Sequence, residues 1–209
     1  DMVGYWADME HPYITYADDY IESEWWSLKN IFDRGLIYKG YKIVPYCPRC
    51  GTALASHEVA QGYRDVEEIS CTARFKVKGK ANTYILAWTT TPWTLPSNVA
   101  LCMNAAEDYS EIECGGKRYI LATALVDKYF GDYKTVSVKK GAEYEYTEYE
   151  PLFDFYKLKE GEKAYYVTCD DYVTLTDGTG VVHIAPAFGQ DDYNVGKIYS
   201  LPVVSLVNG

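Results

Sequence analysis

The sequence is poor in basic residues. Lysine and arginine total 20 against 30 aspartate and glutamate residues, which gives a formal net charge of -10 at pH 7. A broad nucleic-acid-binding surface needs clustered lysine and arginine side chains that replace the counterions of the phosphates. The composition therefore excludes such a surface and leaves room for a small, local contact with RNA.

The sequence also lacks membrane and export signals. No apolar run approaches the roughly 20 residues that a membrane-spanning helix requires. The first residues, Asp1-Met2-Val3-Gly4, do not have the charged-then-apolar order of a signal peptide. We therefore expect a cytoplasmic protein with no membrane partner, and we expect a monomer.

Cysteine is too scarce and too scattered for a disulfide scaffold. The six cysteines are Cys47, Cys50, Cys71, Cys102, Cys114 and Cys169. Only the first two form a close pair, so reduced thiols are expected.

Cys47 and Cys50 enclose Pro48 and Arg49 with the spacing of half a zinc site. A tetrahedral site needs four ligands, and His57 is a candidate for the third. An unmetallated knuckle with two free thiols is the alternative interpretation. A redox dithiol is less favoured, because the pair does not stand at the start of a helix in a βαβ unit.

What is present is the composition of a globular chain, with 48% hydrophobic residues and 22 tyrosines among 209 residues. This is enough for a substantial core and one or two domains. Apolar residues at helical spacing predict a helix over 18–34, ended by Gly35, and residues 38–46 predict a strand. We place a flanking scaffold, helical and with the cysteine knuckle, at 1–61 and a second domain at 62–209.

Short strand-like runs dominate the second domain. Strands are predicted at 71–77, 83–88, 99–103, 111–114, 118–121, 135–138, 164–169, 180–184 and 202–207. Helices are predicted at 122–130 and 191–199, and Gly115-Gly116 predicts a hairpin turn. Residues 139–163 are expected to form a polar connection with one or two irregular strands. The sum is an α+β domain with a mixed, barrel-like sheet.

A segment rich in threonine and proline follows one of these strands, reading Trp88-Thr89-Thr90-Thr91-Pro92-Trp93-Thr94-Leu95-Pro96-Ser97-Asn98. Proline lacks an amide proton, so the chain must leave the sheet here. The threonine hydroxyls and free backbone amides then suit a small polar ligand, with Trp93 as an apolar wall. A capped surface loop is the alternative on local features.

Residues 177–193 predict a turn, a strand, a loop with glycine and the start of a helix. Alternation along the strand places His183 on the same face as Val181, so that it can point inward. A hydrogen-bonded structural histidine is the alternative, and Asp191 and Asp192 are then caps that complement the helix dipole.

Together, these two segments resemble the editing domain inserted in the isoleucine, valine and leucine tRNA synthetases. The first is similar to the threonine-rich peptide of that domain, and the second to its His-x-x-Pro and Gly-x-Asp-Asp-Tyr run. The valine and leucine enzymes usually have arginine where this chain has Thr91, so the resemblance favours the isoleucine branch. It extends over nearly all 209 residues.

The resemblance implies post-transfer editing, in which valine is hydrolysed from mischarged tRNA(Ile), and it leaves pre-transfer editing open as a second route. Such a site is needed because an apolar pocket discriminates weakly against a ligand that lacks one methylene. By the resemblance, Asp192 binds the α-ammonium group of the substrate, and His183 and Trp93 form a limit that admits valine but not isoleucine.

The resemblance also assigns the remaining site residues. The catalytic residues implied are Thr90, Thr91 and Asp192, and the substrate-binding residues are Thr89, Trp93, Thr94, Asn98, His183 and Asp191. Thr90, Thr91 and Asn98 are expected to hold the ester and the terminal ribose around a water molecule, and no covalent enzyme intermediate is expected.

Cofactors and partners follow from the same resemblance. No cofactor is expected for editing; zinc at Cys47 and Cys50, and ATP in an absent synthetic domain, would belong to the full-length enzyme. Neither ATP-binding signature, His-x-Gly-His or Lys-Met-Ser-Lys-Ser, occurs in the sequence. The expected partners are the 3′ end of tRNA(Ile) carrying a noncognate amino acid and the remainder of the synthetase chain. The editing domain is expected to be truncated after Gly209.

Two other functions stay open at this point. A non-catalytic module that binds the tRNA 3′ end, or a zinc knuckle, is supported by the cysteine pair. A cysteine hydrolase that uses Cys169 with His183 is a third interpretation, although nothing in the sequence orders that pair.

Overall fold

The structure is a computed structural model that describes residues 4 and 6–206. The chain divides into two compact units, Asp1–Lys42 and Ile43–Gly209. The domain boundary placed between residues 61 and 62 stays a prediction. None of the helices in the described part of the chain is long and apolar enough to span a membrane.

The first unit contains one helix, α1 (Asp18–Asp33), which confirms the helix predicted at 18–34. Gly35 has a φ of +71°, and the backbone N–H groups of Gly35 and Leu36 donate to the carbonyl oxygens of Phe32 and Ile31. This is the Schellman arrangement that ends many helices, and it needs the left-handed backbone that glycine adopts at low cost.

The second unit begins with the cysteine knuckle. Two short antiparallel strands, β1 (Tyr46–Cys47) and β2 (Thr52–Ala53), precede helix α2 (Ser56–Gln61). The strand predicted at 38–46 is wrong except at Tyr46, because residues 38–45 have no strand beside them with which to form a ladder.

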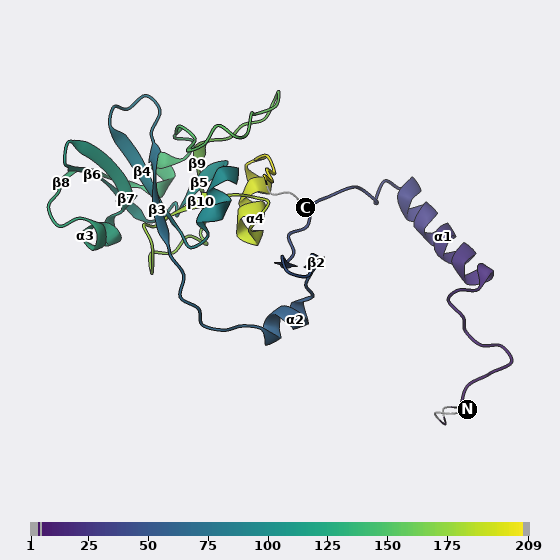
Figure 1. Ribbon diagram of the computed structural model, residues 1–209. Coiled ribbons are helices and arrows are strands. Elements are labelled where there is room, and N and C mark those ends of the chain that lie inside the picture. Colours follow the sequence, from purple (N-terminus) through teal and green to yellow (C-terminus); the bar gives the residue numbers. More distant parts are fainter. Residues whose placement is uncertain (1–3, 5, 207–209) are drawn as a thin grey trace. The chain divides into compact units, whose positions relative to one another are not determined.

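The body of the second unit is a curled eight-stranded sheet in the order β8-β6-β7-β4-β10-β5-β9, with β3 paired to β4 (Figure 1). Its strands are β3 (Cys71–Lys76), β4 (Thr83–Thr89), β5 (Ala100–Met103), β6 (Asp108–Cys114), β7 (Lys117–Ala122), β8 (Lys134–Lys140), β9 (Tyr166–Cys169) and β10 (Val181–Ile184). Parallel and antiparallel pairs both occur, so the predicted mixed sheet is confirmed.

Short helices connect the strands. They are the 3₁₀ helices η1 (Pro92–Ser97), η2 (Thr123–Leu125) and η3 (Gly141–Tyr144), and the α-helices α3 (Val126–Tyr129) and α4 (Gln190–Ile198). Gly115 and Gly116 both have positive φ and join β6 to β7, which confirms the predicted hairpin turn. In the predicted polar connection, η3 is followed by two isolated β-bridges, Val77 to Tyr149 and Glu148 to Tyr166.

The strand predicted at 202–207 is wrong over residues 202–206, and Val207 lies outside the described residues. Leu201 and Val204 are buried, and they pack beside Val195 of α4 in a hydrophobic cluster. Burial against a helix explains their apolar character without a ladder.

The core lies on both faces of the sheet around β4 and β5. Ile85 and Leu101 belong to one buried cluster, whereas Leu86 and Cys102 each face a different one. Full burial of a leucine or isoleucine side chain contributes about 1.5–3 kcal/mol. Because both faces are covered, these strands are rigid supports for the loops that follow them.

Candidate active site

The two motif segments meet because β4 and β10 are parallel neighbours. Trp88 of β4 pairs with Val182 of β10, so both strands point the same way. The carboxyl ends of parallel strands leave a sheet at the same edge. The threonine segment follows β4 and the loop that leads to Asp192 follows β10, and the two are thereby brought together although they lie far apart in the sequence.

They enclose a cavity of about 260 Å³. Six residues predicted for the site line it, namely Thr89, Thr90, Thr91, Thr94, His183 and Asp192. Trp88, Val182, Phe188 and Gly189 complete the lining. The hydroxyl-bearing loop and the carboxylate therefore share one pocket.

The threonine hydroxyls form a short network on one wall. The Thr91 backbone N–H donates to Thr89 Oγ1 at 3.0 Å, and the Thr89 and Thr91 hydroxyls lie 3.2 Å apart. The Thr94 hydroxyl donates to the Thr91 carbonyl oxygen at 2.8 Å. Thr90 is exposed, and its hydroxyl has no partner among the described residues. Thr90 is thus the threonine of this wall that is free to bind a ligand directly.

His183 is 5% exposed, and its Nε2 lies 3.0 Å from the Thr94 Oγ1 atom. Since the Thr94 proton is given to the Thr91 carbonyl, the geometry assigns the imidazole proton to Nε2, which donates to Thr94. His183 Nδ1 is then a buried acceptor without a partner in the described part of the chain. Burial also lowers the pKa of His183 to about 4, so the ring is neutral at pH 7.

Asp192 faces this wall from the first turn of α4. Its Oδ2 accepts a hydrogen bond from the Ala185 N–H at 3.2 Å. Burial raises the pKa of the Asp192 carboxyl to about 6, which means that its negative charge is poorly compensated by the protein. A ligand cation would supply the missing charge.

Gly189 allows the carboxylate to take this position. A Cβ atom at residue 189 would lie 2.9 Å from Asp192 Oδ2, which is closer than such contacts allow. The glycine of the predicted Gly-x-Asp-Asp-Tyr run therefore has a packing reason beside the carboxylate.

Three predicted site residues do not line the pocket. Trp93 is 63% exposed, and Asp191 is exposed on α4. Asn98 is buried, and its side chain is used within the protein: Nδ2 donates to the Ala100 carbonyl at 2.7 Å and Oδ1 accepts from the Tyr149 hydroxyl at 2.6 Å. In this arrangement, both ends of the Asn98 amide hold the loop against the protein.

Four pocket residues were missed by the sequence-based prediction. Trp88 and Val182 are the paired residues of β4 and β10, and their shared position follows from a register that no local pattern reveals. All four residues lie inside the two motif segments, so their place in the sequence was a usable signal.

Known proteins were compared with the chain as a whole. A family model described as tRNA synthetases class I (I, L, M and V) matches residues 1–186 of the 209. The chain belongs to this family. Two relatives match over its full length: the isoleucine–tRNA ligase of Clostridium acetobutylicum at 60% identity and that of Clostridium novyi at 58%. Each alignment covers 100% of this chain and 20% of the relative.

The resemblance of this class I synthetase chain to the isoleucine enzymes is thereby confirmed, and the chain spans 20% of the length of those relatives. Among solved structures, GlLeuRS-CP1 has a TM-score of 0.51 at 14% identity, over 65% of this chain and 66% of that one. At this identity the likeness shows a shared fold. It confirms the predicted class, an α+β domain with a barrel-like sheet.

The cysteine knuckle of this synthetase chain contains the two thiols that were predicted as half of a zinc site, Cys47 and Cys50. The Cys50 backbone N–H donates to Cys47 Sγ at 3.4 Å and lowers the pKa of the Cys47 thiol, which favours the thiolate that zinc needs. His57 is exposed in α2, and no group of three or more metal-binding side chains occurs among residues 4 and 6–206. The described residues thus fit two of four ligands, and zinc at Cys47 and Cys50 stays a prediction.

Proposed function

We propose that this chain is the hydrolytic editing part of an isoleucine tRNA synthetase, and that it removes valine from mischarged tRNA(Ile) after transfer. The observation that carries the proposal is the single cavity lined by Thr90 on one side and Asp192 on the other. Polar groups for an ester and an anion for an ammonium group converge there. Pre-transfer editing would use the same pocket.

Asp192 is proposed to bind the α-ammonium group of the amino acid. A half-buried carboxylate with one N–H donor gains from a charged partner, because partial burial already disfavours its ionised form. The ammonium group would in turn lower the pKa of Asp192 and keep it ionised. This pairing fixes the end of the amino acid that every substrate shares.

His183 is proposed to set the size limit. Its ring is buried in the wall and held by Thr94, so it cannot swing away from a bulkier side chain without breaking that hydrogen bond. A neutral ring also leaves the charge of Asp192 for the substrate. Trp93, the second predicted limit, lies outside the pocket lining, so we assign discrimination to His183.

Hydrolysis is proposed to use water without a covalent enzyme intermediate. The water oxygen attacks the ester carbonyl carbon, the bond from that carbon to the ribose oxygen breaks, and a proton from the water ends on the ribose oxygen. Valine and a tRNA with a free 3′ hydroxyl result. Thr90 and the Thr89–Thr91 network would orient the ester, and the neighbouring ribose hydroxyl would help to hold the water.

A cysteine nucleophile has less support. Burial raises the pKa of Cys169 to about 11, and its thiol donates to the Gly141 carbonyl oxygen. Reactive thiols have lowered pKa values, so this one is inert. Cys169 also does not line the pocket that holds His183.

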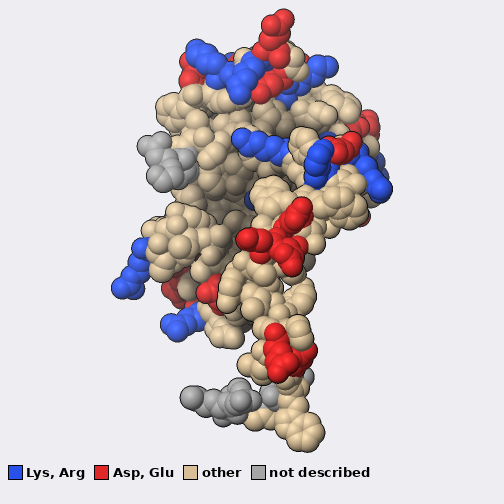
Figure 2. Space-filling model, turned by 90° about the vertical axis from the view of Figure 1, so that its right-hand side faces the viewer, with Lys and Arg blue, Asp and Glu red and all other residues tan. Residues whose placement is uncertain are grey.

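The RNA contact is proposed to be small. On the face shown in Figure 2, basic and acidic side chains of the described residues are interspersed, and they do not gather into one broad basic patch. With a net charge of -10, the chain would bind the tRNA 3′ end through local contacts near the pocket. The remainder of the synthetase would supply most of the affinity.

The proposal is tested in the complete enzyme with valyl-tRNA(Ile). Asp192→Ala should reduce deacylation by about 30-fold or more, as expected when one partner of a desolvated charge pair is removed. Gln190→Ala, an exposed change on the same helix, is the matched control. Unchanged deacylation in Asp192→Ala would exclude this role. Binding of tRNA without any hydrolysis by the wild type would instead favour the non-catalytic 3′-end-binding module.

The size limit has its own test. His183→Ala should allow the cognate isoleucyl ester to be cleaved, since the enlarged pocket gains room for one methylene. Deacylation of isoleucyl-tRNA(Ile) and valyl-tRNA(Ile) is compared in the same preparation. A variant that still spares the isoleucyl ester would remove His183 from this role.

A further inference from the structure

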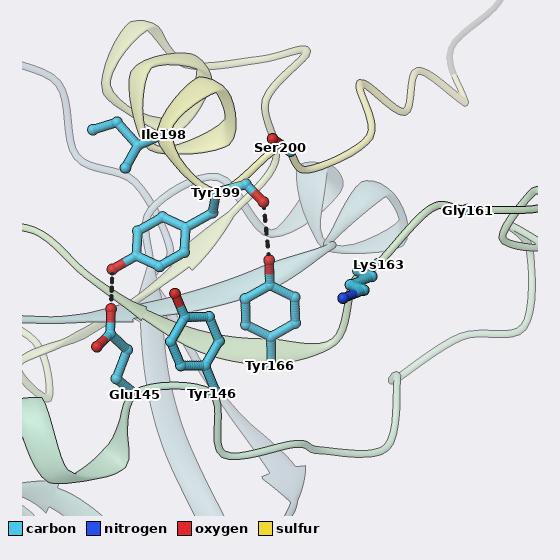
Figure 3. A pocket seen from close by; sticks show the side chains of 8 residues that line it. All are labelled: Glu145, Tyr146, Gly161, Lys163, Tyr166, Ile198, Tyr199 and Ser200. Atoms are coloured by element: carbon cyan, nitrogen blue, oxygen red, sulfur yellow. Dashed lines mark hydrogen bonds between the residues drawn. The ribbon is translucent and has the colours of Figure 1, made fainter.

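A second cavity, here called the tyrosine basin, lies at the other end of α4. It has a volume of about 550 Å³ and is lined chiefly by Glu145, Tyr146, Lys163, Tyr166, Tyr199 and Ser200. Figure 3 shows the three tyrosine rings side by side, with Glu145 on one side and Lys163 on the other. None of these residues belongs to the pocket around Asp192.

The basin presents a free aromatic surface. The Tyr146 ring lies 5.6 Å from the Tyr166 ring and 5.9 Å from the Tyr199 ring, measured between centroids. Tyr166 is 8% exposed, whereas Tyr146 is 62% exposed. Tyr146 is therefore supported by two rings and keeps an open face. Such a platform suits a nucleobase, which stacks through its flat face whatever its identity.

The backbone of the basin is held in an uncommon conformation. Tyr146 has a φ of +62° and Ser200 a φ of +53°, in the left-handed region that side-chain-bearing residues rarely adopt. The Tyr146 N–H donates to the Val167 carbonyl oxygen at 2.8 Å, which holds this turn against β9. Non-glycine residues kept in this region cluster at ligand sites. The turn places the Tyr146 ring over the basin.

The two ends of the basin offer opposite charges. One Glu145 carboxylate oxygen accepts from the Tyr199 hydroxyl, and the other has no partner among the described residues. That oxygen can accept from the exocyclic amine of cytosine or adenine. Lys163 forms no ion pair within the described part of the chain, so its ammonium group is available for a phosphate. A nucleotide fits this arrangement, with the amine of its base at Glu145 and its phosphate at Lys163.

The spacing along α4 connects the basin to the pocket. Asp192 stands in the first turn and Tyr199 directly after the helix, which separates them by about 10 Å at 1.5 Å per residue. Stacked nucleotides are about 3.4 Å apart along a strand. A stacked strand covers this axial distance in about three nucleotides.

We propose that the tyrosine basin binds one unpaired nucleotide of the RNA strand whose aminoacylated 3′ end enters the pocket at Asp192. The nucleotide would lie two or three positions before the terminal one, with its base on Tyr146, its amine at Glu145 and its phosphate at Lys163. This inference rests on the proposed editing function, because it uses the position of the 3′ end. The basin holds the strand and takes no part in breaking the ester.

The experiment uses the complete enzyme and two substrates, valyl-tRNA(Ile) and valyl-adenosine, which lacks the upstream nucleotides. Tyr146→Asn removes the ring, and asparagine tolerates the left-handed backbone. The KM for valyl-tRNA(Ile) should rise about tenfold, within the roughly 5- to 150-fold range that one stacked base implies. The kcat for this substrate and the hydrolysis of valyl-adenosine should not change. Tyr146→Phe keeps the ring and should have the KM of the wild type. Tyr63→Asn, at another exposed tyrosine, is the control and should leave the KM unchanged.

The remaining outcomes separate this inference from the function on which it rests. An unchanged KM for valyl-tRNA(Ile) in Tyr146→Asn would overturn it. Loss of activity on both substrates together with a lower melting temperature would also overturn it. The Tyr146 ring would then stabilise the fold and would not serve as a nucleotide site. A wild type that cleaves neither substrate would refute the editing function instead. In that case, binding of a short single-stranded oligoribonucleotide, about tenfold weaker in Tyr146→Asn, still decides the basin.

Discussion

The two ends of α4 carry sites of opposite character. The pocket at its start is about 260 Å³ and contains His183 and Asp192, whose pKa values are shifted by burial of these side chains. The tyrosine basin at its end is about 550 Å³ and presents the exposed ring of Tyr146. Ligand sites for drug-sized molecules span about 300–1,000 Å³. The volume of the pocket is below this range, whereas the volume of the basin lies within it.

If both proposals hold, one short helix serves two kinds of recognition. Under the proposed function, charge and size are recognised beside side chains that have lost much of their water, because electrostatic contacts are stronger there and a packed wall yields little. A flat aromatic ligand needs an accessible ring and tolerates water at its rim. Each of the following predictions changes one end of α4 and leaves the other as a reference.

The largest effect is expected from Gly189→Ala. The added Cβ would displace the Asp192 carboxylate, and a shift of about 1 Å can lower a rate about 100-fold. Hydrolysis of valyl-tRNA(Ile) and valyl-adenosine should fall together, because the basin is not touched. Gly131→Ala, where an added Cβ meets nothing within 4 Å, is the control. A normal rate in Gly189→Ala would show that the carboxylate position is not critical.

The pH dependence of hydrolysis should report on Asp192 in the pocket and should not depend on the basin. Asp192 must be ionised to bind an ammonium group, and its pKa is about 6 in the free protein. The kcat/KM for valyl-adenosine should therefore be constant from about pH 6 to about pH 7.7, where the α-ammonium group of the substrate loses its proton, and should fall about tenfold per unit below pH 6. The pH profile of kcat should break at a lower pH, because the bound ammonium lowers the pKa of Asp192. Identical profiles for both parameters would contradict this pairing.

Asp192→Asn should stabilise the protein at neutral pH although it removes activity. The folded pKa of about 6 lies above the ordinary aspartate pKa of 3.8, so the native state binds more protons than the unfolded state between these values. Stability is thus lost as the pH rises through 6, and an uncharged amide avoids this cost, by roughly 1–3 kcal/mol. Melting temperatures at pH 7.5 and pH 4 measure it.

Asp177, a carboxyl whose pKa is shifted in the opposite direction, provides the control for that measurement. Lys128 lowers the pKa of Asp177 through a hydrogen bond at 2.7 Å, so Asp177 stabilises the fold above its unfolded pKa and loses this contribution in acid. Asp177→Asn should not raise the melting temperature at pH 7.5. If Asp192→Asn destabilised the protein at that pH, the assignment of an uncompensated charge would be wrong.

The smallest effect is expected in the basin. Tyr166→Phe removes a hydroxyl that donates to the Tyr199 carbonyl oxygen at 3.1 Å, and it should lower the free energy of unfolding by about 0.5–1.5 kcal/mol. Tyr146→Phe is the comparison, because the Tyr146 hydroxyl has no hydrogen-bond partner among the described residues. Denaturant unfolding measures both. Equal losses would mean that the Tyr166 hydroxyl does not order the end of α4.

Much of the fold could be predicted from local patterns. The helix at α1, its end at Gly35 and the hairpin at Gly115 and Gly116 follow from periodicity and from backbone preferences that act within a few residues. The strand predictions failed at 38–45 and 202–206, where apolar residues occur without a neighbouring strand. Whether such a run pairs depends on what lies beside it, and a local pattern contains no such information.

The residues of the candidate site could likewise be predicted only in part from the sequence. His183, Asp192 and the threonines could be singled out because their motifs are short and distinctive. Asn98 shows the limit of that approach. Its position next to the threonines suggested a ligand contact, yet the Tyr149 hydroxyl and the Ala100 carbonyl engage its amide inside the protein.

The sequence by itself determined which chemical groups are available: hydroxyls after one strand, an imidazole and a carboxylate around another, and glycines where the chain must turn. Only the tertiary structure decided which of them share a cavity and in what state. The parallel pairing of Trp88 with Val182 brings the two segments to one edge, and burial then makes His183 neutral and leaves Asp192 short of a partner. Residue types are local properties, whereas proximity and loss of water belong to the packed chain.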